Sequence, residues 1–326
     1  MSASLKCQAS SRGAALVVVL LLAATLSFVM LGVTQIVSAG VHRSYNERLR
    51  TEMIWRAFSA EQVAAAIMKD LTATPAAGKP AAYFGLFQKP VTIDLPDGRV
   101  AIRFADAGRC FNLNSLVKVN NGAAAADPLA VEEFVTLANA LGLSAGEASA
   151  IAEVVVDWID EDTVQSPQGA EDGFYTALPT PFRTGGALLA SKTELRAMDG
   201  VTREKFGLLA PFVCTPPLTA PSVINLNTAS ERDLPLIAAL VPGEVNVNAL
   251  RDALAKRPPG GFAAETDFWD AAGIAPPAGR TGVLPSMVEA RALLTLGDQQ
   301  MEAQMIFLAS EDGAPRLISR AFGAVE

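Results

Sequence analysis

The sequence has little of what catalytic sites are commonly built from. Its 326 residues contain one histidine, His42, and three cysteines, and neither a CxxC pair nor an HExxH motif occurs. No glycine-rich phosphate loop follows a predicted strand. Paired carboxylates could perform acid–base chemistry, but histidine is the commonest group in that role and none lies near them. We therefore expect a protein that is not an enzyme.

Positive charge is also scarce. Lysine and arginine total 26 residues against 34 acidic ones, which gives a net charge of −8, and no basic cluster stands out. A surface that binds phosphate groups normally needs a basic face. The charge balance therefore argues against a nucleic acid as partner.

Charge is absent between Ala14 and Val41, where most residues are apolar. A helix of about 20 apolar residues crosses the hydrocarbon core of a bilayer. The alternative, a cleaved secretory signal, has a shorter apolar region of roughly 7–15 residues. We therefore predict that residues 14–41 are the transmembrane part of a retained helix. Basic residues flank both ends of this segment, so the positive-inside rule leaves its orientation open.

The helix is expected to continue beyond the membrane. From Tyr45 to Leu71 apolar residues recur at helical spacing with charges between them. Strand-like runs follow at 91–95 and 99–104, joined by a turn at Pro96-Asp97-Gly98. A hairpin packed on the amphipathic half of the helix would bury the apolar faces of both.

The pattern between about Asn112 and Val213 is helical, and strands return near the end of the chain. Helix starts are predicted at Asp127-Pro128 and at three capping boxes, which are Ser144/Glu147, Ser191/Glu194 and Thr228/Glu231. Later helices are predicted at 234–240 and 247–256, and strands at 287–296, 301–310 and 315–322, with a turn at Glu311-Asp312-Gly313. Strands on both sides of the helical block indicate an insertion within one α/β domain.

Two short motifs resemble each other, Phe111-Asn-Leu-Asn-Ser-Leu116 and Ile224-Asn-Leu-Asn-Thr-Ala229. Asparagine side chains in such positions commonly bond to the backbone and fix turns, so we interpret both motifs as structural. Cys110 and Cys214 form an even pair on one side of the membrane. They form one disulfide if that side is oxidising, and otherwise two buried free thiols.

Six acidic residues gather between positions 157 and 172. Asp157, Asp160 and Glu161 have the spacing of one helical face, and Asp162, Glu171 and Asp172 follow across a loop. Like charges at this spacing cost a helix roughly a few tenths of a kcal/mol per pair, and carboxylates at its C-terminus oppose the dipole. A hard cation would relieve both effects, and calcium takes 6–8 oxygen ligands. The alternative is a solvated acidic turn.

The N-terminal sequence is the most specific feature. Arg12-Gly13 directly precedes Ala14-Ala-Leu-Val-Val18 after a short polar leader. This arrangement resembles the signal of prepilins and pseudopilins, which a prepilin peptidase cleaves after the glycine on the cytoplasmic face. The resemblance implies that the mature chain starts at Ala14, which is then methylated, and that the residues after the helix lie outside the cytoplasm.

Val18 stands at the fifth mature position, where most such subunits carry glutamate. A carboxylate in the bilayer is expensive unless it is paired. In pilin-like assemblies it pairs with the N-terminal amine of a neighbouring subunit. A subunit without that glutamate suits the first position, at the tip of the assembly.

Motifs along the rest of the chain resemble a single family. They are Cys110-Phe-Asn-Leu-Asn-Ser-Leu116, Asp157-Trp-Ile-Asp-Glu-Asp162, Gly169-Ala-Glu-Asp172 with Tyr175, Ser191-x-x-Glu-Leu195 with Gly200-Val-Thr202, and Ile224-Asn-Leu-Asn-Thr-Ala229. Together they are similar to minor pseudopilin K of the type II secretion system, also called general secretion pathway protein K. The missing glutamate at mature position five is typical of that family.

The resemblance implies an α+β fold in which a long, pilin-like N-terminal helix packs on an antiparallel sheet and a large α-helical domain is inserted. It implies five segments: a leader (1–13), the transmembrane part of the helix (14–41), the first part of the pilin-like domain (42–111), the inserted α-helical domain (112–220) and the second part of the pilin-like domain (221–326).

It further implies a single-pass protein of the bacterial inner membrane with most of the chain in the periplasm. Such a subunit caps the tip of the pseudopilus with minor pseudopilins I and J, and supports export through the outer membrane. The major pseudopilin and the inner-membrane platform are further implied partners. Because the family binds calcium around the acidic motif, the resemblance also implies calcium as cofactor, with these metal ligands: Asp157, Asp160, Glu161, Asp162, Glu171 and Asp172.

The alternative function is that of a membrane-anchored helix-hairpin-helix DNA-binding protein. Residues 224–234, Arg257-Pro-Pro-Gly-Gly-Phe262 and Gly200-Val-Thr202 resemble the DNA receptors of competence systems. Such modules need a glycine hairpin near phosphate and flanking basic residues. The segment after Leu240 is Val-Pro-Gly-Glu-Val, which carries an acid where a basic or small residue is needed.

Overall fold

The computed structural model describes residues 11–120, 122–309 and 314–323. Most of the predicted leader, and the predicted turn at Glu311-Asp312-Gly313, lie outside the described residues. The chain divides into two compact units, one that ends at Arg56 and one that begins at Ala57.

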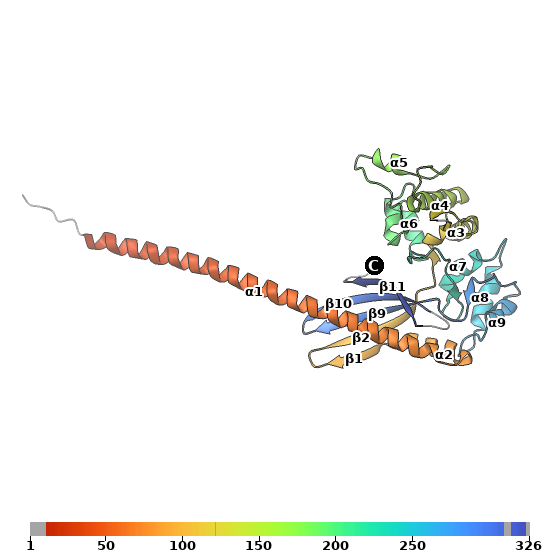
Figure 1. Ribbon diagram of the computed structural model, residues 1–326, viewed down its shortest axis with the longest axis horizontal. Coiled ribbons are helices and arrows are strands. Elements are labelled where there is room, and N and C mark those ends of the chain that lie inside the picture. Colours follow the sequence, from red (N-terminus) through yellow and green to blue (C-terminus); the bar gives the residue numbers. More distant parts are fainter. Residues whose placement is uncertain (1–10, 121, 310–313, 324–326) are drawn as a thin grey trace, which may run out of the picture. The chain divides into compact units, whose positions relative to one another are not determined.

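The first unit is the N-terminal part of α1 (Ser11–Thr72), a single helix of 62 residues (Figure 1). Its apolar side chains between Leu16 and Val41 are exposed, as a segment facing lipid requires. Of the described helices it alone is long and apolar enough to cross a membrane. The prediction of one continuous helix through the apolar and amphipathic segments is confirmed.

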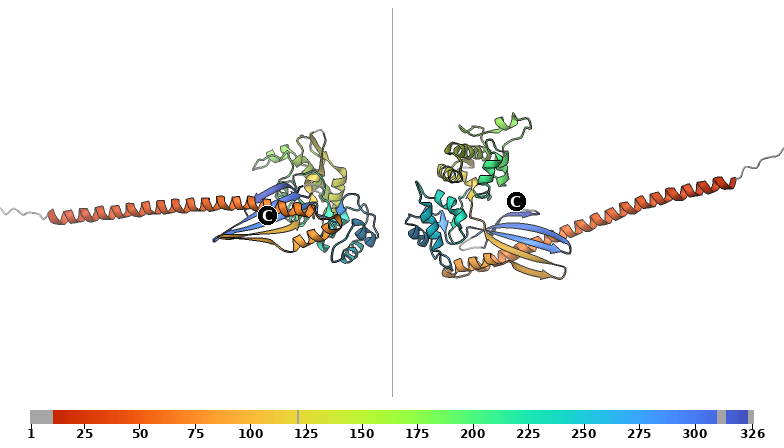
Figure 2. Two further views of the ribbon diagram at one scale, coloured as in Figure 1. Left: turned by 60° about the horizontal axis from the view of Figure 1, so that its bottom comes forward. Right: turned by 180° about the vertical axis from the view of Figure 1, so that it is seen from behind.

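The second unit contains an antiparallel sheet of five strands in the order β1-β2-β9-β10-β11 (Figures 1 and 2). The strands are β1 (Val91–Leu95), β2 (Gly98–Asp106), β9 (Met287–Leu296), β10 (Gln299–Leu308) and β11 (Arg316–Phe322). The predicted hairpin and tail strands are therefore confirmed. Since β2 and β9 are paired neighbours, everything between Asp106 and Met287 is inserted between two adjacent strands.

One face of this sheet packs on α1, whose residues from Ala57 onward belong to the same unit. Small side chains on the helix allow the close approach, and the core residues from the helix are Ala57, Ala60, Ala64 and Met68. Alternate residues of the strands, such as Ile102, Ala292 and Met305, complete the core. A short 3-10 turn (Ala76–Gly78) and α2 (Lys79–Gln88) then lead into β1.

The first part of the insertion is helical and has its own core. Its elements are β3 (Phe111–Asn112), η2 (Leu113–Leu116), β4 (Val117–Asn120), β5 (Ala123–Ala126), α3 (Pro128–Ala140), α4 (Ala145–Ile159), α5 (Asp172–Thr176), η3 (Lys192–Ala197), α6 (Arg203–Leu209) and β6 (Val213–Cys214). The predicted N-cap at Asp127 and the capping boxes at Ser144 and Ser191 are confirmed. The two ends meet where β3 pairs with β6.

A second helical core follows, and the sequence pattern does not separate it from the sheet. Its elements are β7 (Ile224–Asn225), η4 (Glu231–Asp233), α7 (Leu234–Ala239), α8 (Val247–Ala255), α9 (Glu265–Ala272) and β8 (Thr281–Gly282). The capping box predicted at Thr228/Glu231 is wrong. The Thr228 hydroxyl donates to Asp106 Oδ2 at 2.6 Å, and Ser230 and Asp233 form the capping pair instead, with Ser230 N 2.8 Å from Asp233 Oδ2.

In each helical core, the second asparagine of the Asn-Leu-Asn motif makes the same set of hydrogen bonds to the backbone. Asn114 Oδ1 accepts from Leu189 N, and its Nδ2 donates to Leu189 O and Pro216 O. Asn227 Oδ1 accepts from Phe262 N, and its Nδ2 donates to Phe262 O and Val283 O. Each motif begins on a short parallel strand pair. The structural interpretation of both motifs is confirmed.

Candidate metal centre

Three carboxylates converge at the end of α4. Asp160 is the C-cap of α4, Asp162 lies two residues further along, and Glu171 is the N-cap of α5. One ligand oxygen from each lies within 4.8 Å of the others, the spacing of donors around a single cation. The acidic segment thus closes on itself across the loop between residues 162 and 171.

Two of these carboxylates are buried, and each has one oxygen without a hydrogen-bond partner. The exposed fractions of Asp160 and Glu171 are 8% and 6%, and neither Asp160 Oδ1 nor Glu171 Oε1 has a hydrogen-bond donor. Burial, together with the charges of Asp162, Glu171 and Asp157, raises the pKa of Asp160 to about 6. Burial and neighbouring carboxylates also raise the pKa of Glu171. Buried anionic oxygens need a compensating charge, and a hard divalent cation supplies one.

The other acidic residues of the predicted ligand set are placed differently. Helix α4 ends at Ile159, so the prediction that Asp157, Asp160 and Glu161 share a helical face is wrong. Glu161 is exposed and does not join the cluster of three. Asp172 accepts hydrogen bonds from Thr184 N and Oγ1, at 2.9 and 3.0 Å, and pairs with Arg183.

Asp157 is 1% exposed on the last turn of α4, and both its oxygens are engaged by one residue. The Ser166 hydroxyl donates to Asp157 Oδ1 at 2.6 Å, and Ser166 N lies 3.3 and 3.1 Å from Oδ1 and Oδ2. The residues that fit a calcium ion are therefore Asp160, Asp162 and Glu171. Three carboxylates offer up to six oxygens, and calcium completes its usual 6–8 with backbone oxygens or water.

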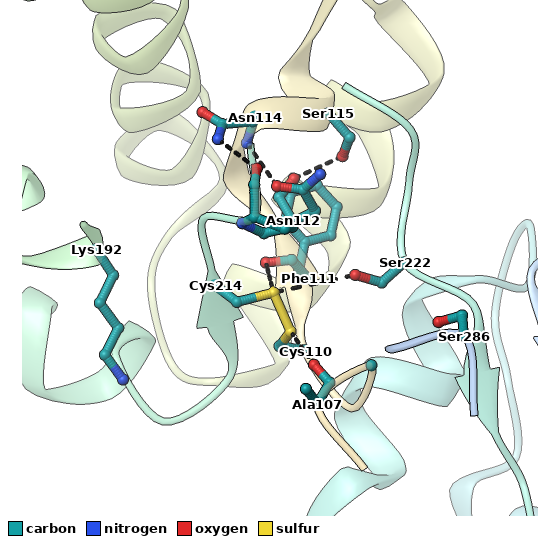
Figure 3. Close-up of a disulfide and its surroundings, with 12 residues drawn as sticks. Ala107, Cys110, Phe111, Asn112, Asn114, Ser115, Lys192, Cys214, Ser222 and Ser286 are labelled. Atoms are coloured by element: carbon teal, nitrogen blue, oxygen red, sulfur yellow. Dashed lines mark hydrogen bonds between the residues drawn. A yellow bond between two sulfur atoms is a disulfide. The ribbon is translucent and has the colours of Figure 1, made fainter. Parts of the chain in front are cut away.

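A disulfide joins Cys110 to Cys214 beside the β3–β6 strand pair (Figure 3). The two Cα atoms are 5.7 Å apart, while 104 positions separate the residues in sequence. The bond thus joins the two ends of the first part of the insertion. Asn112 and Asn114 follow Cys110 along the same segment (Figure 3) and donate to backbone carbonyls, so this junction is fixed both covalently and by hydrogen bonds.

The sequence contains one pattern that is typical of hydrolases. Residues 142–146 read Gly-Leu-Ser-Ala-Gly, the spacing of a hydrolase nucleophile elbow. Ser144 is instead the N-cap of α4, and its hydroxyl lies 2.7 Å from Glu147 Oε2 within a capping box. The sole histidine, His42, belongs to the other unit of the chain. Ser144 therefore has a structural role in starting α4.

The residues expected to carry processing and assembly lie on α1. Gly13 and Ala14 are helical, and Val18 is 55% exposed in the apolar segment. Together the long apolar helix, the antiparallel sheet on its continuation and the helical insertion define a membrane-anchored, pilin-like subunit. This is the fold class predicted from the sequence.

Comparisons with known proteins give the family. Residues 109–218 and 224–293 match two family descriptions, both of type II secretion system (T2SS) protein K. Type II secretion system protein K of Pectobacterium carotovorum is 31% identical over 82% of this chain and 81% of its own length. That of Aeromonas hydrophila is 28% identical over 96% of this chain and 98% of its own length. The chain belongs to the type II secretion system protein K family, and is a minor pseudopilin.

A solved structure supports the same assignment. The crystal structure of the GspK-GspI-GspJ complex from enterotoxigenic Escherichia coli contains a chain that matches with a TM-score of 0.68 and 25% identity. The match covers 87% of this chain and all of the other. The family is a structural component of a secretion system.

Proposed function

We propose that this protein caps the tip of the periplasmic pseudopilus and supports export of proteins through the outer membrane. The observation that carries this is the insertion of all residues between β2 and β9 into a pilin-like sheet. A helical body of that size on one subunit hinders the stacking of a further subunit above it. Val18, at the fifth mature position, also supports a tip position. The glutamate usually found there pairs with the N-terminal amine of a neighbouring subunit, and the first subunit has no neighbour above it.

The proposal includes processing and location. A prepilin peptidase would cut between Gly13 and Ala14, and the remaining helix would hold the protein in the inner membrane with its second unit in the periplasm. The oxidising periplasm is a compartment in which a bond such as Cys110–Cys214 persists. Minor pseudopilins I and J are the proposed partners, as in the related complex; the major pseudopilin and the inner-membrane platform are further ones.

Calcium is the proposed cofactor, held by Asp160, Asp162 and Glu171. Their convergence and the unpartnered, buried oxygens of Asp160 and Glu171 support it. The ion would neutralise these charges and tie the end of α4 to the start of α5. Titration calorimetry of the full-length protein in detergent should detect calcium binding that D160N abolishes. The matched control is E204Q, which removes an exposed carboxylate from α6.

Co-purification tests the assembly. Tagged protein produced with minor pseudopilins I and J should retain both after detergent extraction, and labelled protein should lie at one end of isolated pseudopili. Purification without either partner, or label distributed along the filament, would contradict a tip position.

The alternative, DNA binding by a helix-hairpin-helix module, finds no support in the second helical core. Arg257, the basic residue of the Arg-Pro-Pro-Gly-Gly-Phe motif, donates to the carbonyls of Leu226, Asn227 and Ala229. Its guanidinium thus supports the loop after β7. Glu244 lies in the turn where a basic residue would be needed.

A further inference from the structure

The loop between Asp162 and Glu171 is held by α4 through two acidic side chains that do not belong to the three-carboxylate cluster. Asp157 binds Ser166 through the three contacts given above. One turn earlier on the same helix, Glu153 Oε2 accepts from Gln168 N at 2.6 Å. The two carboxylates are four residues apart on α4 and accept hydrogen bonds from two nearby backbone amides of the loop, those of Ser166 and Gln168.

The fit between Asp157 and the loop is close. A Cβ atom added to Gly169 would lie 2.0 Å from Asp157 Oδ2, so any larger residue there would displace the Asp157 carboxylate or the loop. Gln165 Nε2 donates to Gly169 O at 2.7 Å and closes the loop on itself. Two residues after Gly169 comes Glu171, one of the three candidate ligands. The position of Glu171 thus depends on where Asp157 holds Ser166 and Gly169.

We infer that Asp157 is a positioning residue for the cation site, which it serves by anchoring Ser166 so that Glu171 meets Asp160 and Asp162. The inference rests on the proposed calcium function and departs from the sequence-based expectation that Asp157 is itself a ligand. A ligating carboxylate directs a free oxygen at the ion, whereas both Asp157 oxygens accept hydrogen bonds from Ser166. Residues that orient ligands in this way commonly change metal affinity 10–100-fold.

A double-mutant cycle separates a positioning residue from a ligand. We expect D157N to weaken calcium binding by about tenfold in titration calorimetry of the full-length protein in detergent. S166A, which changes no carboxylate, should weaken it by a comparable factor. The double variant D157N/S166A should be no weaker than D157N alone, because both changes break one link. The charge-matched control E161Q, which neutralises an exposed acid beside the cluster, should leave the affinity within about twofold.

Hydrogen exchange without calcium supplies a readout independent of the ion. In the wild type the amides of Ser166 and Gln168 are bonded to Asp157 and Glu153, so both should be protected. D157A, which removes both acceptor oxygens, should accelerate exchange at Ser166 and leave the amides of α3 unchanged. Retained protection at Ser166 in D157A would overturn the inference.

The failures of the two proposals are distinguishable. Unchanged calcium affinity in S166A, together with a large loss in D157N that adds to any effect of S166A, would make Asp157 a ligand. That outcome overturns the positioning role while calcium binding stands. Absence of calcium binding to the wild type would overturn both proposals.

Discussion

Cys110 and Cys214 are bonded to each other at the two ends of the first part of the insertion, although 104 positions separate them in the sequence. The chain between them contains most of the first helical core and the candidate metal centre. A crosslink that closes so long a loop removes much of the conformational freedom of the unfolded chain. The bond is therefore expected to be a major source of the insertion's stability.

Replacing both cysteines should lower the free energy of unfolding of the insertion. For a closed loop of about 100 residues the chain-entropy relation gives roughly 4–5 kcal/mol, and we expect C110A/C214A to lose about 3–5 kcal/mol. Guanidinium unfolding of the oxidised protein, followed by fluorescence, measures the change. The wild type unfolded in the presence of a reductant is the matched comparison and should lose a similar amount. An unfolding midpoint equal to that of the wild type would contradict the expectation.

Asn114 makes three buried hydrogen bonds that N114A would remove. Leu189 N and the carbonyls of Leu189 and Pro216 would lose their partner inside the core. Each buried group left unsatisfied costs about 1–3 kcal/mol, so we expect a loss of at least roughly 3 kcal/mol. N139A, at an exposed position of α3, should cost less than about 0.5 kcal/mol. Similar unfolding midpoints for the two variants would show that the hydrogen bonds of Asn114 do not stabilise the core.

The C-terminal strand is tied to α1 by Arg320 and Glu61. The guanidinium lies 2.6 and 2.7 Å from the two carboxylate oxygens and 4.8 Å from the centre of the Phe58 ring. Glu61 is largely buried, so R320A leaves a carboxylate without its counter-charge and should cost roughly 2–3 kcal/mol. R316A removes an exposed arginine from the same strand and should have little effect. Thermal unfolding of both variants distinguishes these outcomes.

The stability of the calcium-free protein should depend on pH through Asp160. Because its pKa is raised to about 6 in the folded protein, folding favours the protonated form. Its contribution is therefore fully present below about pH 4 and is lost as the pH rises through 6. In the presence of a chelator, D160N should have the same melting temperature as the wild type at pH 4.5 and a higher melting temperature at pH 7.5. A difference between the two proteins that stays constant across this range would contradict the buried, uncompensated state of Asp160.

The sequence predicted elements best where local chemistry decides them. The strand at Met287–Leu296, the N-cap at Asp127 and the capping box at Ser144 follow from alternation or from side chains a few residues apart. The box predicted at Thr228 failed because its hydroxyl bonds Asp106, which lies 122 positions earlier in the chain. Contacts over such separations cannot be inferred from a local pattern.

The candidate site shows the same division. Its location was predictable, because acidic residues gather in one short segment of the sequence. Which of these residues converge was not predictable. It depends on where α4 ends, at Ile159, and on the hydrogen bond that the Ser166 hydroxyl donates to Asp157. The helices predicted at 234–240 and 247–256 are confirmed, but their separation from the sheet as a second core was not predicted, because β7 and β8 are only two residues each and are far apart in sequence.

Entry of this chain into the pilin pathway would remove the leader and modify the new N-terminus. N-terminal sequencing and mass measurement of the protein, extracted from the membranes of cells that contain a prepilin peptidase, test it most directly. A mature chain that starts at Ala14 and carries one methyl group is the predicted result. A chain that still starts at Met1 in those cells would contradict entry into that pathway.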